Sequence, residues 1–279
     1  MSLISLLIAL AAERSLSASS WQFKTYYQYW SNWLLKKDLL TKCWQSQVGV
    51  LSFIFIPVLC VYGLLLVVDD GLLHLVLSTL VLIVCFGSVA TRQTYKHYLQ
   101  AAFRGELTTC QFYHSQLSQD KNLPKMAFGE TLIWLNYRYY IAIMLFFVFF
   151  GAPGAVFYRL LTTLIEQPEW HNKADEGEAL TEQESVVVQV EQNTYQSCQR
   201  LLFWLDCLPV RLVSFAYMLV GHFSNALAVW LENLFDINKA PHFILAEVAH
   251  KSEDKMIAVE DCTTQTCALV QLAKRTVLL

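Results

Sequence analysis

The chain has 279 residues, of which 55% are hydrophobic and only 15% are charged, and its net charge is −3. Soluble domains carry about 25% charged residues, so this composition excludes an ordinary soluble protein and is typical of a membrane protein. A net negative charge supplies no general basic field, and we expect no nucleic-acid partner. The eight cysteines form no C-x-x-C motif. We therefore expect no metal site and reduced thiols.

Apolar segments occur at five places along the chain. The first, about residues 2–12, is short for a span, and because it has no basic n-region we expect it to stay attached rather than be cleaved. Two uncharged runs, 48–68 and 72–90, predict a helical hairpin. The runs 139–165 and 201–223 contain charges or helix breakers but are long enough to cross a bilayer, which takes about 20 apolar residues. These segments predict an all-α, polytopic helical membrane protein with four to five spans.

Polar regions divide the predicted fold into parts. Residues 1–165 form an N-terminal membrane domain with cytoplasmic loops, and residues 166–200 form an acidic loop. The charged membrane helix at 201–223 follows, and residues 224–279 predict amphipathic cytoplasmic helices. Because this last region closes with a basic pair followed by Thr-Val-Leu-Leu, we expect it to contain the start of a final membrane helix.

The distribution of Lys and Arg predicts the orientation. These residues concentrate in 14–42, 92–125 and 239–275, which the positive-inside rule places in the cytoplasm. The acidic loop around Asp175 is poor in them and is expected on the outer side of the membrane.

Charged groups inside the last predicted span indicate a candidate site. Asp206 and Arg211 flank Pro209 in a run apolar enough to enter the bilayer. A charge at the bilayer centre costs about 2.5–3.5 kcal/mol on insertion scales, so each group needs a partner or a polar cavity. The two lie about 140° apart around a regular helix and do not pair by spacing alone. Asn136 and Arg138 are about 200° apart, so only one faces the interior unless the chain departs from a regular helix there.

Three interpretations of this polar group stay open. It could be a scaffold in which Asp–Arg pairs fix the helix register. It could instead be a pocket for an anionic or amide-bearing ligand, or part of a proton or ion path. The candidate partners stand at the ends of predicted membrane segments: Glu13, Arg14, Asn136 and Arg138.

With these residues in place, the chain resembles the AmpE family of inner-membrane proteins, which are encoded beside the AmpD amidase in Gram-negative bacteria. The longer matching runs are Leu205-Asp206-x-x-Pro209-Val210-Arg211-Leu212 and Leu132-x-Trp134-x-Asn136-x-Arg138-x-Tyr140. The shorter ones are Glu13-Arg14, Tyr95-x-x-Tyr98-Leu99-x-Ala101-Ala102-x-Arg104 and Gly221-His222. More remotely, the chain is similar to the CobD/CbiB membrane family of cobalamin biosynthesis, although it lacks that family's N-terminal Pro-x-x-His-Pro signature.

The resemblance implies a regulatory signalling modulator of the bacterial inner membrane, linked to β-lactamase induction, the response to antibiotic and cell-wall recycling. It leaves open whether the protein is an enzyme: the alternatives are a membrane-embedded synthase-like enzyme and a transporter of cell-wall fragments, and no cofactor is specified. The expected partners are the lipid bilayer, an anionic small molecule and a protein of cell-wall recycling. The ligand-binding candidates are Glu13, Arg14, Arg104, Asn136, Arg138, Asp206, Arg211 and His222.

Overall fold

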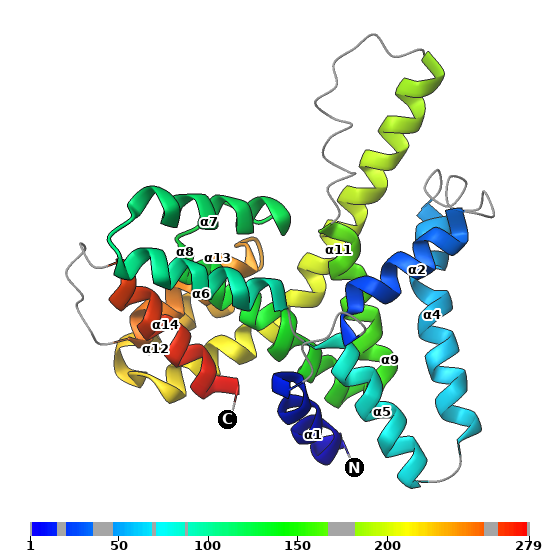
Figure 1. Ribbon diagram of the computed structural model, residues 1–279, viewed down its shortest axis with the longest axis horizontal. Coiled ribbons are helices and arrows are strands. Elements are labelled where there is room, and N and C mark those ends of the chain that lie inside the picture. Colours follow the sequence, from blue (N-terminus) through cyan, green and yellow to red (C-terminus); the bar gives the residue numbers. More distant parts are fainter. Residues whose placement is uncertain are drawn as a thin grey trace. The chain divides into compact units, whose positions relative to one another are not determined.

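The computed structural model describes residues 2–15, 21–35, 47–68, 71–86, 89–166, 182–253 and 262–277. These residues form helices joined by turns, with no strand among them, which confirms the all-α prediction (Figure 1). The chain forms two compact units: unit 1 is Met1–Gly87 with Ile143–Leu202, and unit 2 is Ser88–Ala142 with Phe203–Leu279. Each unit combines segments that are distant in sequence, a grouping that the order of apolar runs does not reveal.

Unit 1 is built mainly from apolar helices. They are α1 (Ser2–Ser15), α2 (Phe23–Leu35), α4 (Gln47–Val67), α5 (Gly71–Cys85), most of α9 (Ala142–Ile165) and the first part of α11 (Glu182–Val220). α5 packs against both α1 and α4. Aromatic contacts join α2 to α4, because the rings of Tyr27 and Trp30 lie 5.8 and 6.2 Å from the ring of Phe53.

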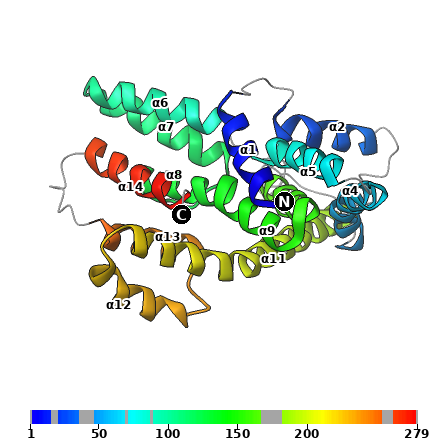
Figure 2. The ribbon, with the colours of Figure 1, turned by 90° about the horizontal axis from the view of Figure 1, so that it is seen from below.

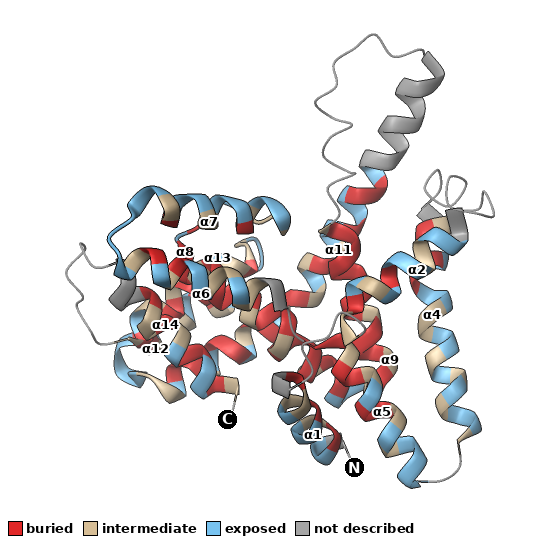
Figure 3. Ribbon diagram, in the orientation of Figure 1, coloured by how far each residue is buried: buried red, intermediate tan, exposed pale blue. Residues whose placement is uncertain are grey.

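Three helical stretches among the described residues are long and apolar enough to cross a membrane: Gly49–Val67, Phe128–Ile165 and Asn193–Val220. In an apolar 18-residue window of the first stretch only 17% of the residues are buried, against 56% in such a window of the second, and Figure 3 shows α4 largely exposed and α9 largely buried. Exposed apolar side chains such as those of α4 are stable where hydrocarbon surrounds them. This pattern identifies the chain as a membrane protein.

Two expected membrane segments are shorter apolar helices. α5 ends at Cys85, five residues before the end of the predicted run 72–90, and a new helix, α6, begins at Val89. From Thr91 onward the sequence of α6 is polar, which accounts for the change. The first apolar segment forms α1, which extends past residue 12 to include Glu13 and Arg14. The Asp-Asp turn before α5 lies outside the described residues.

α9 is interrupted inside the membrane-spanning stretch. Gly151 has φ 70° and ψ −163°, a conformation essentially restricted to glycine, so the helix is broken there. Pro153 follows and has no backbone N–H to donate to the preceding turn. The Gly-Ala-Pro-Gly sequence therefore produces the interruption that it predicts.

Unit 2 contains the remaining helices. They are α6 (Val89–Phe103), α7 (Leu107–Asp120), α8 (Phe128–Asn136), the π-helical turn η2 (Tyr137–Ile141), the second part of α11, α12 (Phe223–Leu234), α13 (Pro241–Ser252) and α14 (Cys262–Val277). α6 and α7 lie side by side, and α8 packs against α13 and α14 (Figure 2). The C-terminal residues expected to begin a membrane helix are thus helical up to Val277, with Leu269 and Leu272 buried in this unit.

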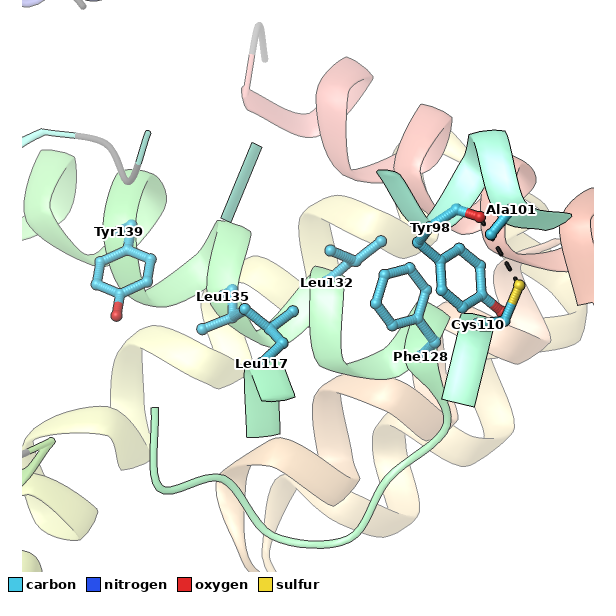
Figure 4. Packing of buried hydrophobic residues seen from close by; sticks show 8 residues of the cluster. All are labelled: Tyr98, Ala101, Cys110, Leu117, Phe128, Leu132, Leu135 and Tyr139. Atoms are coloured by element: carbon cyan, nitrogen blue, oxygen red, sulfur yellow. Dashed lines mark hydrogen bonds between the residues drawn. The ribbon is translucent and has the colours of Figure 1, made fainter. Parts of the chain in front are cut away.

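A buried apolar cluster holds α6, α7 and α8 together. The rings of Tyr98 and Phe128 are stacked with their centres 3.6 Å apart, and the Cys110 thiol donates a hydrogen bond to the Tyr98 carbonyl oxygen at 3.8 Å (Figure 4). Leu117 and Leu132 extend the cluster along α7 and α8. Tyr95, Tyr98 and Ala102 of α6 lie on one helix face and supply one wall of this core.

The junction between α11 and α12 approaches α13 closely. A Cβ atom at Gly221 would contact the carbonyl oxygen and Cβ of Ser252 at less than van der Waals distance. The backbone N–H of His222 donates to the same carbonyl at 2.8 Å. Only glycine at position 221 allows this approach, which fixes the end of α13 against the start of α12.

α11 begins earlier than the sequence suggested. The helix runs from Glu182 to Val220 and includes Pro209, so the second part of the expected acidic loop 166–200 is helical. Its charges do not oppose this, because Glu and Gln are good helix formers. Residues 167–181 of that loop, with Asp175, lie outside the described residues.

Candidate functional site

The centre of unit 2 is the point where α8 passes into the π-turn η2. The π-turn changes the rotation between neighbouring residues, so Asn136 and Arg138 need not lie on opposite faces as they would on a regular helix. Arg138 is only 8% exposed, and its guanidinium carbon lies 5.0 Å from the centre of the Trp134 ring. Trp134 in turn stacks on Tyr137 at 5.1 Å. A buried cation held against an aromatic face is a favourable arrangement where water is excluded.

Asp206 of α11 reaches this centre. It is 2% exposed, and its Oδ1 accepts a hydrogen bond of 2.8 Å from the hydroxyl of Tyr137. Hydrogen bonds to an ionised carboxylate are short and stronger than neutral ones. The expectation that this buried carboxylate has a partner is met by a tyrosine of the π-turn.

Two histidines of α13 face α8. His250 Nε2 lies 2.8 Å from Glu130 Oε1, and Glu130 Oε2 accepts the Ala127 backbone N–H at 3.1 Å. The ring of His242 lies 5.8 Å from that of Trp134, and its Nε2 is buried with no hydrogen-bond partner among the described residues. Together with the preceding residues these side chains form what we call the polar cluster: Glu130, Trp134, Tyr137, Arg138, Asp206, His242 and His250.

Burial controls the protonation of His242. Desolvation lowers the pKa of this imidazole below its usual value, the positive charge of Arg138 lowers it further, and the negative charge of Glu130 opposes both. His242 is therefore neutral at physiological pH. A neutral imidazole beside a guanidinium leaves Arg138 as the positive centre of this side of the cluster.

Two further polar atoms lie at the edge of the polar cluster. Tyr217 of α11 is fully buried and lies beside Asn136. Neither the Tyr217 hydroxyl nor Asn136 Nδ2 has a hydrogen-bond partner at bonding geometry within the described part of the chain. Buried polar groups are nearly always paired, so these two neighbouring atoms pair with each other after a small shift or bond a ligand or water.

Arg211 does not join this network. Its guanidinium donates to the carbonyl oxygens of Cys207, Leu234 and Asp236 at 2.6, 2.8 and 2.7 Å. It thereby binds the C-terminal end of α12, where the last carbonyls lack helical partners. The expected need of Arg211 for a partner is therefore met by backbone carbonyl groups and not by an ion pair with Asp206.

The other predicted candidates lie elsewhere. Glu13, 8% exposed, and Arg14 belong to α1 of unit 1, and the Arg14 side chain is outside the described part. Arg104 lies in the exposed turn between α6 and α7. His222 is exposed at the N-cap of α12. The structure thus brings Asn136, Arg138 and Asp206 into one region of unit 2, leaves Arg104 and His222 exposed in that unit, and assigns Glu13 and Arg14 to unit 1.

Sequence reasoning missed four buried or partly buried charged groups. Glu130, His242 and His250 occur in segments of mixed polarity, where such residues are common and give no signal. Arg159 is different: it is 6% exposed within α9, and its guanidinium carbon lies 5.6 Å from the centre of the Phe23 ring. A single arginine in an apolar run is detectable by the same reasoning that identified Asp206.

No group of three or more His, Cys, Asp or Glu side chains positioned to hold a metal ion occurs in the part of the chain that the structure describes. The side chains of the polar cluster offer hydrogen-bond donors, the guanidinium of Arg138, and the carboxylates of Glu130 and Asp206, each of which already accepts a hydrogen bond. Such a set can bind a carboxylate, a phosphate or an amide carbonyl.

Comparisons with known proteins agree on one family. The family model described as "Regulatory signalling modulator protein AmpE" matches residues 1–279. A relative named "Protein AmpE", from Shigella flexneri, is 26% identical over 205 residues, which cover 70% of this chain. The same alignment covers 66% of the relative, just under two thirds of its length. No solved structure matches the chain.

Proposed function

This chain belongs to the AmpE family of regulatory signalling modulator proteins, and from that premise we propose that it acts as a multi-pass protein of the bacterial inner membrane in β-lactamase induction and cell-wall recycling. The match over the whole chain supports a regulatory role rather than a shared domain in an unrelated protein. The apolar helices supply the membrane anchorage that this role requires. Neither the synthase-like enzyme nor the transporter is favoured by these observations.

The polar cluster is the observation that carries the proposal. Arg138 and Asp206 are 8% and 2% exposed, and both lie in helices long enough to span a membrane. Ionisable groups at such positions are costly to maintain and are functional candidates by default. Since Asp206 accepts a hydrogen bond from Tyr137, a signal would bind at the neighbouring polar atoms Asn136 Nδ2 and the Tyr217 hydroxyl.

The chemistry of these donors indicates the ligand class. Arg138 supplies a positive charge, and Asn136 Nδ2 and the Tyr217 hydroxyl supply unpartnered polar atoms. An anionic or amide-bearing small molecule would complete their hydrogen bonds. Binding at the contact between α8, η2 and α11 would change the packing of unit 2, which a protein partner could sense. We propose that cell-wall fragments bearing carboxylate and amide groups are the signal.

A complementation experiment tests the role. A strain lacking its own copy of the gene would receive this chain, an empty vector, or the chain with an early stop codon, and β-lactamase activity would be measured with and without an inducing antibiotic. Membrane fractionation would locate the tagged protein in parallel. We expect the chain in the inner-membrane fraction and a change in induction relative to the empty vector. Induction identical to that of the empty vector, with the protein present in the membrane, would contradict the proposal.

A further inference from the structure

Unit 1 contains a groove that the proposed function does not use. It has a volume of about 250 Å³ and is lined by α1, α4, α5 and α9. Most of its walls are leucine, phenylalanine and other apolar side chains. The polar side chains that line it are Ser5, Tyr62, His74 and Ser78.

The interruption of α9 forms one wall of the groove. Gly151, Ala152 and Pro153 all line it, and the non-helical Gly151 leaves the backbone on either side without the regular ladder of hydrogen bonds. Non-helical backbone at membrane depth is tolerated where it is buried in protein or lines a cavity. The groove is therefore a feature that the sequence maintains by placing the helix break there.

Ser78 is the second indication of a ligand. Its side chain is only 6% exposed and belongs to the lining of the groove. The hydroxyl of the neighbouring Thr79 donates to the Leu75 carbonyl oxygen at 2.7 Å. Ser78 lies one helical turn from His74, so the two polar groups follow one face of α5 along the groove. Hydroxyl and imidazole groups in an otherwise apolar wall offer hydrogen bonds to an occupant of the groove.

The surroundings of the groove identify the occupant. Its rim includes Phe150, Leu66 and Tyr62, which are 68%, 63% and 51% exposed, on helices whose outer faces suit hydrocarbon. His74 lies in the first turn of α5, near the α4–α5 connection and hence near one membrane boundary, whereas Ser78 lies a turn deeper. The polar groups thus begin at the level of lipid headgroups, and the apolar wall continues into the bilayer.

We propose that the groove binds one acyl chain of a bilayer phospholipid, whose ester or headgroup oxygens accept hydrogen bonds from Ser78 and His74. The chain would lie against Phe147 and the break in α9. The bilayer itself supplies such a ligand, and a volume of about 250 Å³ accommodates part of one acyl chain rather than a bulky soluble metabolite. This inference rests on unit 1 alone and does not depend on the proposed function.

Photolabelling of the full-length protein tests the site. The protein would be reconstituted in vesicles of phosphatidylethanolamine and phosphatidylglycerol that contain phosphatidylglycerol with a diazirine on its acyl chain, and labelled peptides would be identified by mass spectrometry. Leu66→Trp fills the groove from its exposed rim, and Ser78→Ala removes the hydroxyl. Leu64→Trp is the matched control, because Leu64 lies on the same helix, is 52% exposed and does not line the groove.

The expected result is labelling of α5 and α9 peptides at the groove that unlabelled phosphatidylglycerol suppresses. Labelling there should fall several-fold in Leu66→Trp, fall less in Ser78→Ala, and stay at the wild-type level in Leu64→Trp. Thermal stability in detergent would show that each variant is folded. Labelling of these peptides that is unaffected by both Leu66→Trp and Ser78→Ala, or reduced equally by Leu64→Trp, would overturn the proposal, because the label would then report ordinary contact with surrounding lipid.

Discussion

The Tyr137–Asp206 pair shows how a residue-scale cost shapes the site. A carboxylate that is 2% exposed inside an apolar helix must be compensated, and the tyrosine hydroxyl at 2.8 Å does so. The cost of the charge made Asp206 predictable from sequence. Its partner was not predictable, because Tyr137 is 69 positions away and its orientation depends on the π-turn. Arg138 was likewise predictable as important, whereas the Trp134 ring beneath it was not.

Removal of the tyrosine hydroxyl should destabilise the protein. Tyr137→Phe leaves a buried carboxylate with one hydrogen bond fewer, and a hydrogen bond to a charged group contributes about 1.5–3 kcal/mol. Unfolding of the detergent-solubilised protein should show a loss of that size. Tyr113→Phe, on α7, is the control and should have an effect near zero. Equal stability of Tyr137→Phe and the wild-type protein would show that the bond contributes nothing.

The pH dependence of stability should reflect His242. Burial and the charge of Arg138 lower the pKa of His242 in the folded state, so the unfolded state binds its proton more readily. The stabilisation from the neutral ring is complete above the pKa of histidine in the unfolded state, about 6.5. It is lost as the pH falls through the lower pKa of His242 in the folded state.

The measurement is the melting temperature of the wild-type protein and of His242→Phe between pH 8 and pH 5. This range extends roughly one to two pH units on either side of the pKa of a histidine in the unfolded state. The wild-type melting temperature should fall with decreasing pH, and His242→Phe should reduce the slope. His97→Phe changes an exposed histidine that stacks on Tyr113 and serves as the control. Identical slopes for the wild type and His242→Phe would refute this assignment.

At the scale of the helices, the sequence predicts which segments are helical better than it predicts where each helix begins and ends. Apolar runs mark α4, α9 and α11 because a bilayer requires them, and the Gly151 break follows from glycine and proline chemistry. The start of α11 at Glu182 was hidden because its first turns are acidic and resemble a loop. The early end of α5 was hidden because hydropathy continues past Cys85 while the helix does not.

Gly221 tests the packing of α11 and α12 on α13. A methyl group there would clash with the carbonyl and side chain of Ser252, which belong to a helix end and cannot move freely. Gly221→Ala should therefore lower stability by about 1–3 kcal/mol, as overpacking does. Gly63→Ala on α4 is the control, because nothing lies within 4 Å of a Cβ there, and it should be neutral or gain up to about 1 kcal/mol. A stable Gly221→Ala variant would show that the junction can separate.

At the scale of the whole molecule, the chain combines an apolar unit with a unit that contains the polar cluster. The order of segments along the sequence predicted consecutive regions, whereas each compact unit joins segments from both halves of the chain. Such grouping depends on contacts between distant helices, for which periodicity and composition give no signal.

The membrane orientation remains a prediction from charge. Reporter fusions at Asp175 and at Gln119 should be active on opposite sides of the membrane, with Asp175 periplasmic and Gln119 cytoplasmic, because basic segments stay in the cytoplasm. Alkaline phosphatase and green fluorescent protein fusions report the two sides. Cytoplasmic fluorescence from the Asp175 fusion would show that the predicted orientation is wrong.

The central claim is that the polar cluster binds a signal rather than only holding helices together, and Tyr217→Phe tests it most directly. The Tyr217 hydroxyl is buried and has no hydrogen-bond partner among the described residues, so its removal should leave the melting temperature and membrane yield unchanged or slightly higher. β-Lactamase induction in complemented cells should nevertheless fall toward the empty-vector level, whereas Tyr137→Phe should lose stability and function together. Wild-type induction by Tyr217→Phe, or induction that follows melting temperature across both variants, would contradict the claim and make the cluster a scaffold.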